Sequence, residues 1–249
     1  MKWLLILVLL VGWFDTQSYA VTVLLDPGHG GSDMGAKMFY AYVDKYGRKR
    51  NLHVLEKDLS LIFAKKIQQK LKKQGVVVHL SRSYDHEISL DARAALAQKL
   101  KADIFISIHM NASTNRTSRG FETFYLDNHN DVAVKKVEDI ENVGLTGDQL
   151  IIKQIITDLI VERTAKASKS LAESVHAGIK KKTHKSFNLK DRGIKPGLFY
   201  VLAMAKRPGI LLEVSFLSNP KELKKVLTSE FQEEYSKAVA EGVISYLRK

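Results

Sequence analysis

The stretch Val23-Leu24-Leu25-Asp26-Pro27-Gly28-His29-Gly30-Gly31 decides how the rest of the chain is understood. Its first three residues form a short apolar run, which is typical of a strand buried on both faces. Proline and glycines then end the strand abruptly and place His29 on a turn. Glycine tolerates positive φ angles and lets other groups approach the backbone closely. A buried strand that ends in a histidine on such a turn is typical of one half of a metal site or a phosphate site.

The phosphate alternative does not fit the residues that follow the turn. Asp33 stands where a dinucleotide-binding fingerprint has its third glycine, and its charge would repel a phosphate. Gly30 and Gly35 have the spacing of a Walker loop, but Ala36 and Lys37 follow in place of Lys and Ser or Thr. A serine nucleophile is not indicated either, because the sequence has no Gly-x-Ser-x-Gly elbow. The turn is therefore interpreted as part of a metal site.

The composition limits both the size of the fold and the ligands that a metal can have. The chain has 249 residues, of which 45% are hydrophobic and 27% charged, values that are ordinary for one globular domain. Cysteine does not occur, so disulfides, thiolate zinc sites and cysteine nucleophiles are excluded. Any metal must be held by His, Asp or Glu. The net charge of +12 favours an anionic cell-wall polymer or membrane surface as partner; no nucleic-acid-binding motif occurs, and nucleic acid is not expected as a partner.

The first 20 residues have the pattern of a secretory signal peptide. Lys2 is followed by an apolar core from Trp3 to Trp13 and by Ser18-Tyr19-Ala20, a small-x-small cleavage pattern. The apolar core is shorter than a membrane span requires, although an uncleaved N-terminal anchor is the alternative. We expect cleavage after Ala20, a mature domain over residues 21–249 with no stable membrane span, and export to the bacterial periplasm, the cell wall or the medium.

Strand and helix patterns alternate along the mature chain. Helical spacing is expected over 55–74, 90–100, 148–162, 164–182 and 230–247, and strands over 23–25, 76–80, 104–108, 121–126, 199–202 and 210–214. The segment 37–51 is expected to be an exposed loop or small hairpin, and 127–148 an irregular surface insertion. The alternation predicts a single α/β domain with a twisted, mostly parallel central sheet and helices on both faces. The strand over 121–126 is expected at an edge or antiparallel to its neighbour.

Three strands end in groups that can carry chemistry. His29 follows the first strand, His109 closes the strand over 104–108, and Glu213 lies near the end of 210–214. The carboxyl ends of parallel strands meet at one edge of a sheet, which is where ligands bind. A charged glutamate among apolar residues is costly unless it is paired or bound, and Glu56 stands at the head of the first helix. Two histidines and one carboxylate form an open zinc shell, leaving the other carboxylate as a general base.

The spacing alone leaves the ligand set open. His29 taken singly fits a turn residue, and His109 taken singly fits a hydrogen-bonded core histidine. His53 and Glu56 are three residues apart and would share a helical face, so either is a candidate. The inverted zincin pattern would need a histidine where Lys57 stands, and His-Glu-x-x-His is absent.

Taken together, several segments resemble one known family in order over essentially the whole mature chain. They are Leu25-Asp-Pro-Gly-His-Gly-Gly-Ser-Asp-Met-Gly-Ala36, Glu56-Lys-Asp58, Ser107-Ile-His-Met-Asn-Ala112 and Glu213-Val-Ser-Phe-Leu-Ser-Asn219, with Leu80-Ser-Arg82, Asp91-Ala-Arg93, Gly120-Phe-Glu122 and Ser170-Leu-Ala172. The chain thus resembles the zinc-dependent N-acetylmuramoyl-L-alanine amidases, which cleave peptidoglycan between N-acetylmuramic acid and the first L-alanine of the peptide stem.

The resemblance implies a role for each residue at the predicted site. It matches the family's zinc ligands to His29, Glu56 and His109, which would hold one Zn2+ per chain. It matches the catalytic glutamate to Glu213, and it gives Asn111 a position near the cleft with a substrate-contact role. Peptidoglycan is then the expected substrate and partner.

Three departures from the family pattern carry open questions. The segment between Ala36 and Glu56 is longer than usual and holds aromatic residues, which suit either a substrate-binding flap or a folded surface loop. Ser215 stands where many members have glycine or another small residue, and little effect is expected from it. In some relatives the region matching 127–165 carries a helix that blocks the zinc site until an activator protein removes it. In this chain that region offers the carboxylates Glu138, Asp139 and Glu141.

Two other functions are alternatives to the amidase interpretation. A non-catalytic protein of the same fold would bind or regulate the wall, and zinc analysis with a chelator-sensitive assay would distinguish it. A metallopeptidase would cut within the stem peptide, whereas an amidase leaves an intact stem with a free alanine amine.

Overall fold

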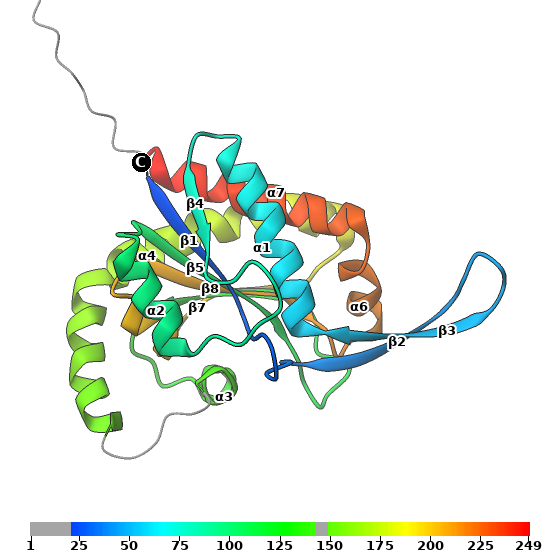
Figure 1. Cartoon of the computed structure of the whole chain (residues 1–249), viewed down its shortest axis with the longest axis horizontal. Helices are drawn as coiled ribbons and strands as arrows, with labels where there is room; N and C mark the ends of the chain where they lie inside the picture. The colour runs from blue at the N-terminus through cyan, green and yellow to red at the C-terminus, as the bar shows by residue number, and fades with distance from the viewer. Residues whose placement is uncertain (1–20, 143–148) are drawn as a thin grey trace, which may run out of the picture.

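The computed structural model describes residues 21–142 and 149–249, so the expected signal peptide lies outside the described residues. Within these ranges the main sheet has the strand order β4-β1-β5-β8-β6-β7 (Figure 1). β1, β4, β5 and β8 run parallel, whereas β6 is antiparallel to β8 and parallel to β7. The bounds are β4 Val77–Leu80, β1 Thr22–Pro27, β5 Ile104–Asn111, β8 Gly209–Phe216, β6 Phe121–Leu126 and β7 Asp191–Gly197.

This sheet confirms the predicted α/β class with a mostly parallel sheet. Every residue of β5 and β8 is buried, as expected of strands covered on both faces. β6 is antiparallel to β8, as one of the two expectations had it, but it is not an edge strand because β7 pairs with its other side. β7 itself was not predicted. Its Gly193 and Pro196 are poor strand formers, and proline is tolerated there because the strand lies at the sheet edge.

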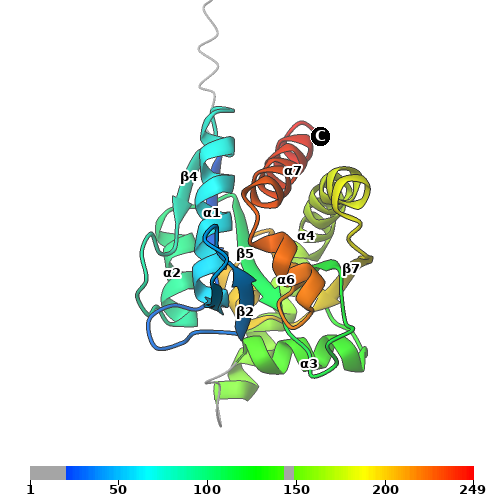
Figure 2. The same cartoon turned by 90° about the vertical axis from the view of Figure 1, so that its right-hand side faces the viewer.

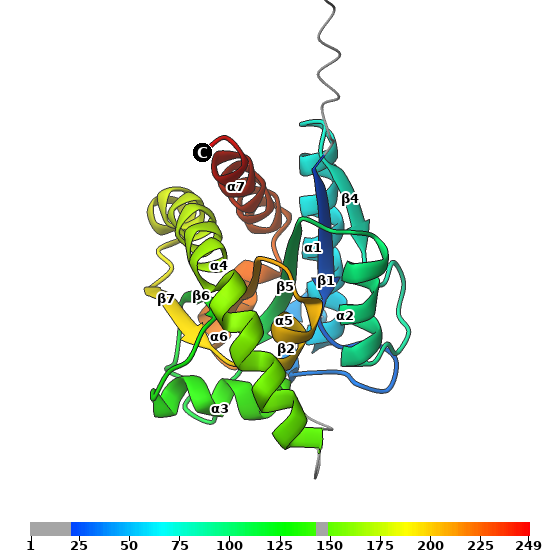
Figure 3. The same ribbon diagram turned by 90° about the vertical axis from the view of Figure 1, so that its left-hand side faces the viewer.

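Helices cover both faces of the sheet (Figures 2 and 3). One core layer contains residues of α1, α6, α7 and the second half of α4; the other contains residues of α2 and α5 and the first half of α4. The bounds are α1 Glu56–Lys72, α2 Leu90–Lys99, α4 Gln149–Phe187, α5 Tyr200–Ala205, α6 Pro220–Val226 and α7 Ser229–Leu247. Ser89 caps α2 by accepting a hydrogen bond from the Ala92 amide. No helix in the described ranges is long and apolar enough to cross a membrane.

Several element predictions are wrong, each for a physical reason. The run predicted as a strand over 199–202 forms α5, because a short apolar run fits a buried helix as well as a buried strand. The two helices predicted over 148–162 and 164–182 are one helix, α4. Inside it the Thr164 hydroxyl donates to the Ile160 carbonyl. The supposedly irregular segment 127–148 contains helix α3, Val132–Glu141.

The segment 37–51 forms the greater part of a hairpin, as one of its two expectations had it. β2 Lys37–Val43 pairs with β3 Lys49–Leu55, and the hairpin projects from the body of the molecule (Figure 1). Its aromatic side chains lie on the outside, with Phe39 73% and Tyr46 67% exposed. β3 ends at Leu55 and α1 begins at the next residue, Glu56, so the base of the hairpin adjoins Glu56.

Candidate metal centre

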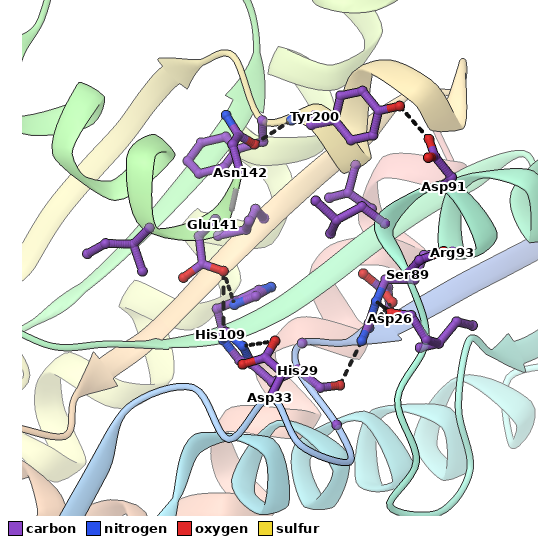
Figure 4. A pocket seen from close by; sticks show the side chains of 18 of the residues that line it. Asp26, His29, Asp33, Ser89, Asp91, Arg93, His109, Glu141, Asn142 and Tyr200 are labelled. Atoms are coloured by element: carbon purple, nitrogen blue, oxygen red, sulfur yellow. Dashed lines mark hydrogen bonds and ion pairs between the residues drawn. The ribbon is translucent and has the colours of Figure 1, made fainter. Parts of the chain in front are cut away.

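Four side chains converge where the parallel strands end. His29 Nε2, Glu56 Oε1, His109 Nδ1 and Glu141 Oε2 all lie within 4.8 Å of one another in the described part of the chain. Glu56 Oε1 is 3.1 Å from His29 Nε2 and 3.2 Å from His109 Nδ1, and Glu141 Oε2 is 2.8 Å from His109 Nδ1. Figure 4 shows Glu141 reaching down towards His109 above His29 and Asp33.

The two histidine nitrogens of this cluster behave like metal ligands. Both His29 Nε2 and His109 Nδ1 are buried, and neither has a hydrogen-bond partner among the described residues despite the nearby carboxylates. The ring nitrogens therefore point into the space between the carboxylates and not along a hydrogen bond. Buried unpaired nitrogens are costly, and a cation at this point would satisfy both. Two imidazoles with carboxylates are a donor set that can hold a metal ion.

His29 is fixed by a strained turn and by its second ring nitrogen. Its φ is 60°, a left-handed conformation that is uncommon for a residue with a side chain. His29 Nδ1 is 2.8 Å from Asp33 Oδ2, so Nδ1 donates the hydrogen bond and Nε2 is left for a metal. Glycines make room for the ligands, as the sequence predicts. A Cβ on Gly28 would lie 2.4 Å from the His109 ring, and one on Gly35 2.6 Å from both Glu56 and His29.

Two buried arginines hold the backbone of this turn from below. Arg93 donates to the carbonyls of Pro27 and His29 at 2.6 and 2.7 Å, and Arg82 donates to the carbonyl of Gly28 at 2.8 Å. Arg93 also pairs with the buried carboxylate of Asp26 at 2.7 Å. Burial opposes the ionisation of Asp26, but Arg93 and a hydrogen bond from a serine outweigh it and keep the pKa of Asp26 below its ordinary 3.8. We call Asp26, Arg82 and Arg93 the arginine clamp.

Glu56 is placed by backbone amides. Its Oε2 accepts a hydrogen bond from the Ala36 amide and its Oε1 one from the Met110 amide, both at 2.8 Å. His53, the alternative candidate, lies on β3 outside the cluster, where its ring stacks on Phe39 with centroids 4.7 Å apart.

Glu213 lies beside the cluster but is not one of its members. It is paired in register with His109 on β5 and with Glu122 on β6. Both β5 and β8 extend beyond the predicted strands, so Glu213 lies inside its strand and not near its end. Its side chain is buried, and Oε2 has no hydrogen-bond partner in residues 21–142 and 149–249. Burial, reinforced by the charges of Glu141, Glu56 and Glu122, raises the pKa of Glu213 well above its ordinary value.

The buried groups of the cluster shift one another's pKa values. Burial would lower the pKa of His29, but Asp33 and Glu56 outweigh it and raise the pKa to about 9. Burial likewise opposes the protonation of His109, and Glu141 and Glu56 raise its pKa to about 10. Burial disfavours the ionised Glu56, but the two imidazoles outweigh it and lower its pKa. A metal must therefore displace protons from both histidines.

Glu141 is a cluster member whose role the sequence left open, and it is carried by α3. This helix begins at the N-cap Asp131, which accepts from the Ala133 amide at 2.7 Å. Glu138 is buried and accepts a hydrogen bond from the Leu198 amide and lies 2.6 Å from His129 Nε2. Asn142 donates to the Leu198 carbonyl at 3.0 Å and accepts from the Tyr200 amide at 2.8 Å. We call Glu138, His129 and Asn142 the α3 latch.

The other carboxylate offered by this region does not reach the cluster. Asp139 is exposed and pairs with Lys135 at 2.8 Å. The sequence signal for α3 was its cap, Asp131 before Val132-Ala133-Val134. Ala133, Val137 and Ile140 also have helical spacing, which is a second sequence signal for this helix.

Two hollows adjoin the cluster on either side of α3. One, of ≈ 440 Å³, is lined by residues that include Asp33, Asp91 and Tyr200 (Figure 4). The other, of ≈ 600 Å³, is lined by residues that include Asn111 and Glu213. Asn111 donates to Glu122 Oε1 at 2.8 Å, and its position in this hollow agrees with the expectation of a place near the cleft. The hairpin segment 37–51 lines neither hollow.

Comparisons with known proteins match this chain to one family. Residues 23–245 match the family model described as N-acetylmuramoyl-L-alanine amidase. The chain is 33% identical over 233 residues to N-acetylmuramoyl-L-alanine amidase AmiA of Escherichia coli, covering 90% of this chain and 75% of AmiA. The crystal structure of an N-acetylmuramoyl-L-alanine amidase from Clostridium difficile 630 is 33% identical, with a TM-score of 0.68 over 93% of this chain and 99% of that one.

A further solved structure shares the fold. The CwlD amidase from Clostridioides difficile, solved in complex with the GerS lipoprotein, has a TM-score of 0.66 at 24% identity, over 92% of this chain and 98% of that one.

Proposed function

The chain belongs to the N-acetylmuramoyl-L-alanine amidase family, and from this premise we propose that it hydrolyses peptidoglycan between N-acetylmuramic acid and the first L-alanine of the stem. The observation that carries the proposal is the convergence of His29, Glu56 and His109 beside a buried carboxylate, Glu213. Positive charge on the chain supports an anionic wall polymer as its target.

We assign His29, Glu56 and His109 as ligands of one zinc ion per chain. The fit rests on the two buried, unpaired ring nitrogens and on a carboxylate held between them by backbone amides. Asp33 supports the assignment, because a ligating histidine commonly donates its other N–H to a carboxylate. When bound, zinc supplies a Lewis acid that polarises the amide carbonyl and makes water acidic enough to act as a nucleophile near neutral pH.

Glu213 is assigned as the general base and acid. Burial and the surrounding carboxylates raise the pKa of Glu213, and a raised pKa favours its taking up a proton from water. Glu213 takes the proton from the attacking water and then delivers it to the nitrogen of the departing L-alanine amine. The unpaired Oε2 is free to make both contacts because no hydrogen bond from the described residues holds it. Asn111, which lines the same hollow, is assigned a substrate contact.

The position of Glu141 indicates a closed state of this enzyme. Glu141 lies 2.8 Å from His109 and lines both hollows beside the cluster. The α3 latch holds it there. We propose that the region 127–165 is autoinhibitory and that an activator protein at the wall draws α3 away. The complex of CwlD with a lipoprotein gives a precedent for an amidase of this fold with a protein partner.

Export places the enzyme on its substrate. We propose that residues 1–20 are a signal peptide and that the mature chain acts in the periplasm or cell wall. The apolar run of Trp3–Trp13 and the Ser18-Tyr19-Ala20 pattern support this.

Digestion of purified sacculi tests the proposed function. The wild type and Glu141→Gln are incubated with sacculi, with and without a zinc chelator, and the products are identified by mass. We expect chelator-sensitive release of intact stems with a free L-alanine amine, faster for Glu141→Gln. Cuts within the stem would instead identify a metallopeptidase. Zinc binding without release of any product from either protein would identify a wall-binding or regulatory protein.

A further inference from the structure

The ≈ 600 Å³ hollow beside the cluster has a cationic wall that catalysis does not use. Arg192 and Lys195, two residues of the edge strand β7, line this hollow together with Glu213 and Glu141. Both side chains lie next to the same carboxylate oxygen, Glu122 Oε2, with Lys195 Nζ at 2.5 Å and Arg192 Nε at 3.2 Å. Glu122 is buried, and its other oxygen is taken by Asn111. The part of the wall formed by β7 and Glu122 thus has two cations for one carboxylate, while Glu56, Glu141 and Glu213 line the same hollow at the cluster.

Arg192 has hydrogen-bonding capacity to spare. Its Nε is buried without hydrogen-bond geometry towards Glu122, and its guanidinium makes no hydrogen bond within residues 21–142 and 149–249. The guanidinium carbon lies over the ring of Phe216, 5.0 Å from the centroid, which is within the range of a cation–π contact. A planar guanidinium with unused N–H donors matches the two oxygens of a carboxylate. The side chain is 27% exposed, so a ligand in the hollow can reach it.

The hollow on the opposite side of α3 has a different charge pattern in its lining. Asp33, Glu87 and Asp91 line it, and Asp91 accepts a hydrogen bond from the Tyr200 hydroxyl (Figure 4). The arginine there, Arg93, is committed to Asp26 and to backbone carbonyls. Both hollows include His29 and Glu141 in their lining, so they meet at the cluster. A substrate lying across the cluster therefore meets Arg192 and Lys195 on one side and Asp33, Glu87 and Asp91 on the other.

We propose that Arg192 and Lys195 bind a free carboxylate of the peptide stem, so that the stem lies along β7 and the sugar lies on the Asp91 and Tyr200 side. This inference rests on the proposed amidase function. Stem peptides carry carboxylates close to the L-alanine amide, whereas the sugar side offers hydroxyls and amides. Repulsion from Asp33, Glu87 and Asp91 disfavours the reverse orientation. Arg192 and Lys195 would then determine which stems the enzyme prefers.

Soluble muramoyl tripeptides with blocked C-termini test this inference. Some of these peptides carry one free carboxylate, at the second or the third residue, and the others carry none. Their cleavage by the Glu141→Gln protein is compared. We expect kcat/KM to be about tenfold to a hundredfold higher for a peptide with the carboxylate, mainly through KM. Adding Arg192→Gln should bring the ratio of acid to amide substrate close to one, and Arg192→Lys should give an intermediate ratio. Lys180→Gln is the matched control, because Lys180 is an exposed cation on α4 that pairs with Asp191, and it should leave the ratio unchanged.

Three results would overturn the inference. Equal kcat/KM for acid and amide peptides would do so while leaving the amidase function intact. An acid-to-amide ratio of kcat/KM that is unchanged in Arg192→Gln would also overturn the inference. A shifted pH optimum at constant ratio would show that Arg192 only balances Glu122 beside Glu213. If no peptide is cleaved, the proposed function fails, and calorimetric binding of the same peptides still decides the inference: the acid must bind more tightly than the amide and lose that advantage in Arg192→Gln.

Discussion

The metal centre has two parts that the protein holds in different ways. His29, Glu56 and His109 belong to strand ends and to the head of α1, and buried side chains or backbone amides fix the turn of His29 and the carboxylate of Glu56. Glu141 belongs to α3, a helix with a single buried apolar residue, Val134. Its position depends on polar contacts of the α3 latch to the backbone around Leu198.

This difference means that the residues on the sheet and α1 are held firmly, whereas Glu141 can leave the cluster. Moving His29 or Glu56 would require breaking the arginine clamp or the central sheet, which are parts of the core. Moving Glu141 requires breaking only the hydrogen bonds of the α3 latch. α3 lies at the outside of the molecule in all three overall views. We therefore expect mutations in the first part to abolish function and mutations in the second part to release it.

The largest expected effect comes from removing a ligand on the sheet. His109→Ala should lose zinc. Its activity should fall by about 10²–10⁴-fold or more, which is the loss expected for removing a general base. Glu141→Ala should keep its zinc and gain activity. Metal content by mass spectrometry and product release from sacculi measure both effects. Zinc loss in Glu141→Ala equal to that in His109→Ala would contradict the division of the site into two parts.

Breaking the arginine clamp should destabilise the fold and loosen the metal together. Arg93→Met leaves Asp26 buried without its partner, at a cost of about 3–5 kcal/mol in the free energy of unfolding. Zinc affinity should fall by about 10–100-fold, because the turn that presents His29 loses its support. Denaturant unfolding and competition with a zinc chelator measure the two. Unchanged zinc affinity in a folded Arg93→Met would show that the clamp does not support the ligand.

The same pair predicts how stability depends on pH. The pKa of Asp26 is lower in the folded protein than its ordinary 3.8. Its stabilising contribution is therefore complete above that value and is lost as the pH falls through the folded pKa. The wild type should lose more stability than Asp26→Asn in this acidic range, measured by denaturant unfolding at several pH values. Parallel losses in both proteins would contradict the role of this ion pair.

Loosening the α3 latch should raise activity without unfolding the protein. Glu138→Gln weakens charge-assisted hydrogen bonds worth about 1.5–3 kcal/mol, so release of stems should rise by about tenfold or more. The matched control is Asp139→Asn on the same helix, because Asp139 is exposed and pairs only with Lys135 among the described residues. Equal activity in Glu138→Gln and the wild type would show that the latch does not limit access.

The smallest effects are expected in the hairpin arm. Phe39→Ser changes an exposed side chain that stacks only on His53 in the described structure, so stability should change by about 0.5 kcal/mol or less. Digestion of sacculi should stay within about twofold, as for a folded surface element. A large loss of sacculus binding with normal zinc content would instead identify the arm as a substrate-binding flap.

The sequence predicted the sheet and the clustered residues on it because their signals are local. Apolar runs that end in His29 and His109 stand out, and a glutamate inside Ile210–Val214 stands out equally. Glu56 was separated from His53 only by the resemblance to the family, and the structure places it in the cluster. β7 was missed because most of its residues are polar or poor strand formers, and α3 was missed because buried Glu138 interrupts its short apolar pattern. Glu138 and Arg192 look like surface residues until the partners that bury them are known.

The sheet order also determines when during folding the centre is completed. β8, with Glu213, lies in the middle of the sheet between β5 and β6 but comes near the end of the chain. His109 and Glu213 become neighbours only through this long-range pairing, which closes late and slowly compared with local contacts. A chain that has been synthesised only as far as β7 therefore has neither a complete sheet nor a complete centre. The strand order makes the centre depend on β8, the last strand of the sheet in the sequence.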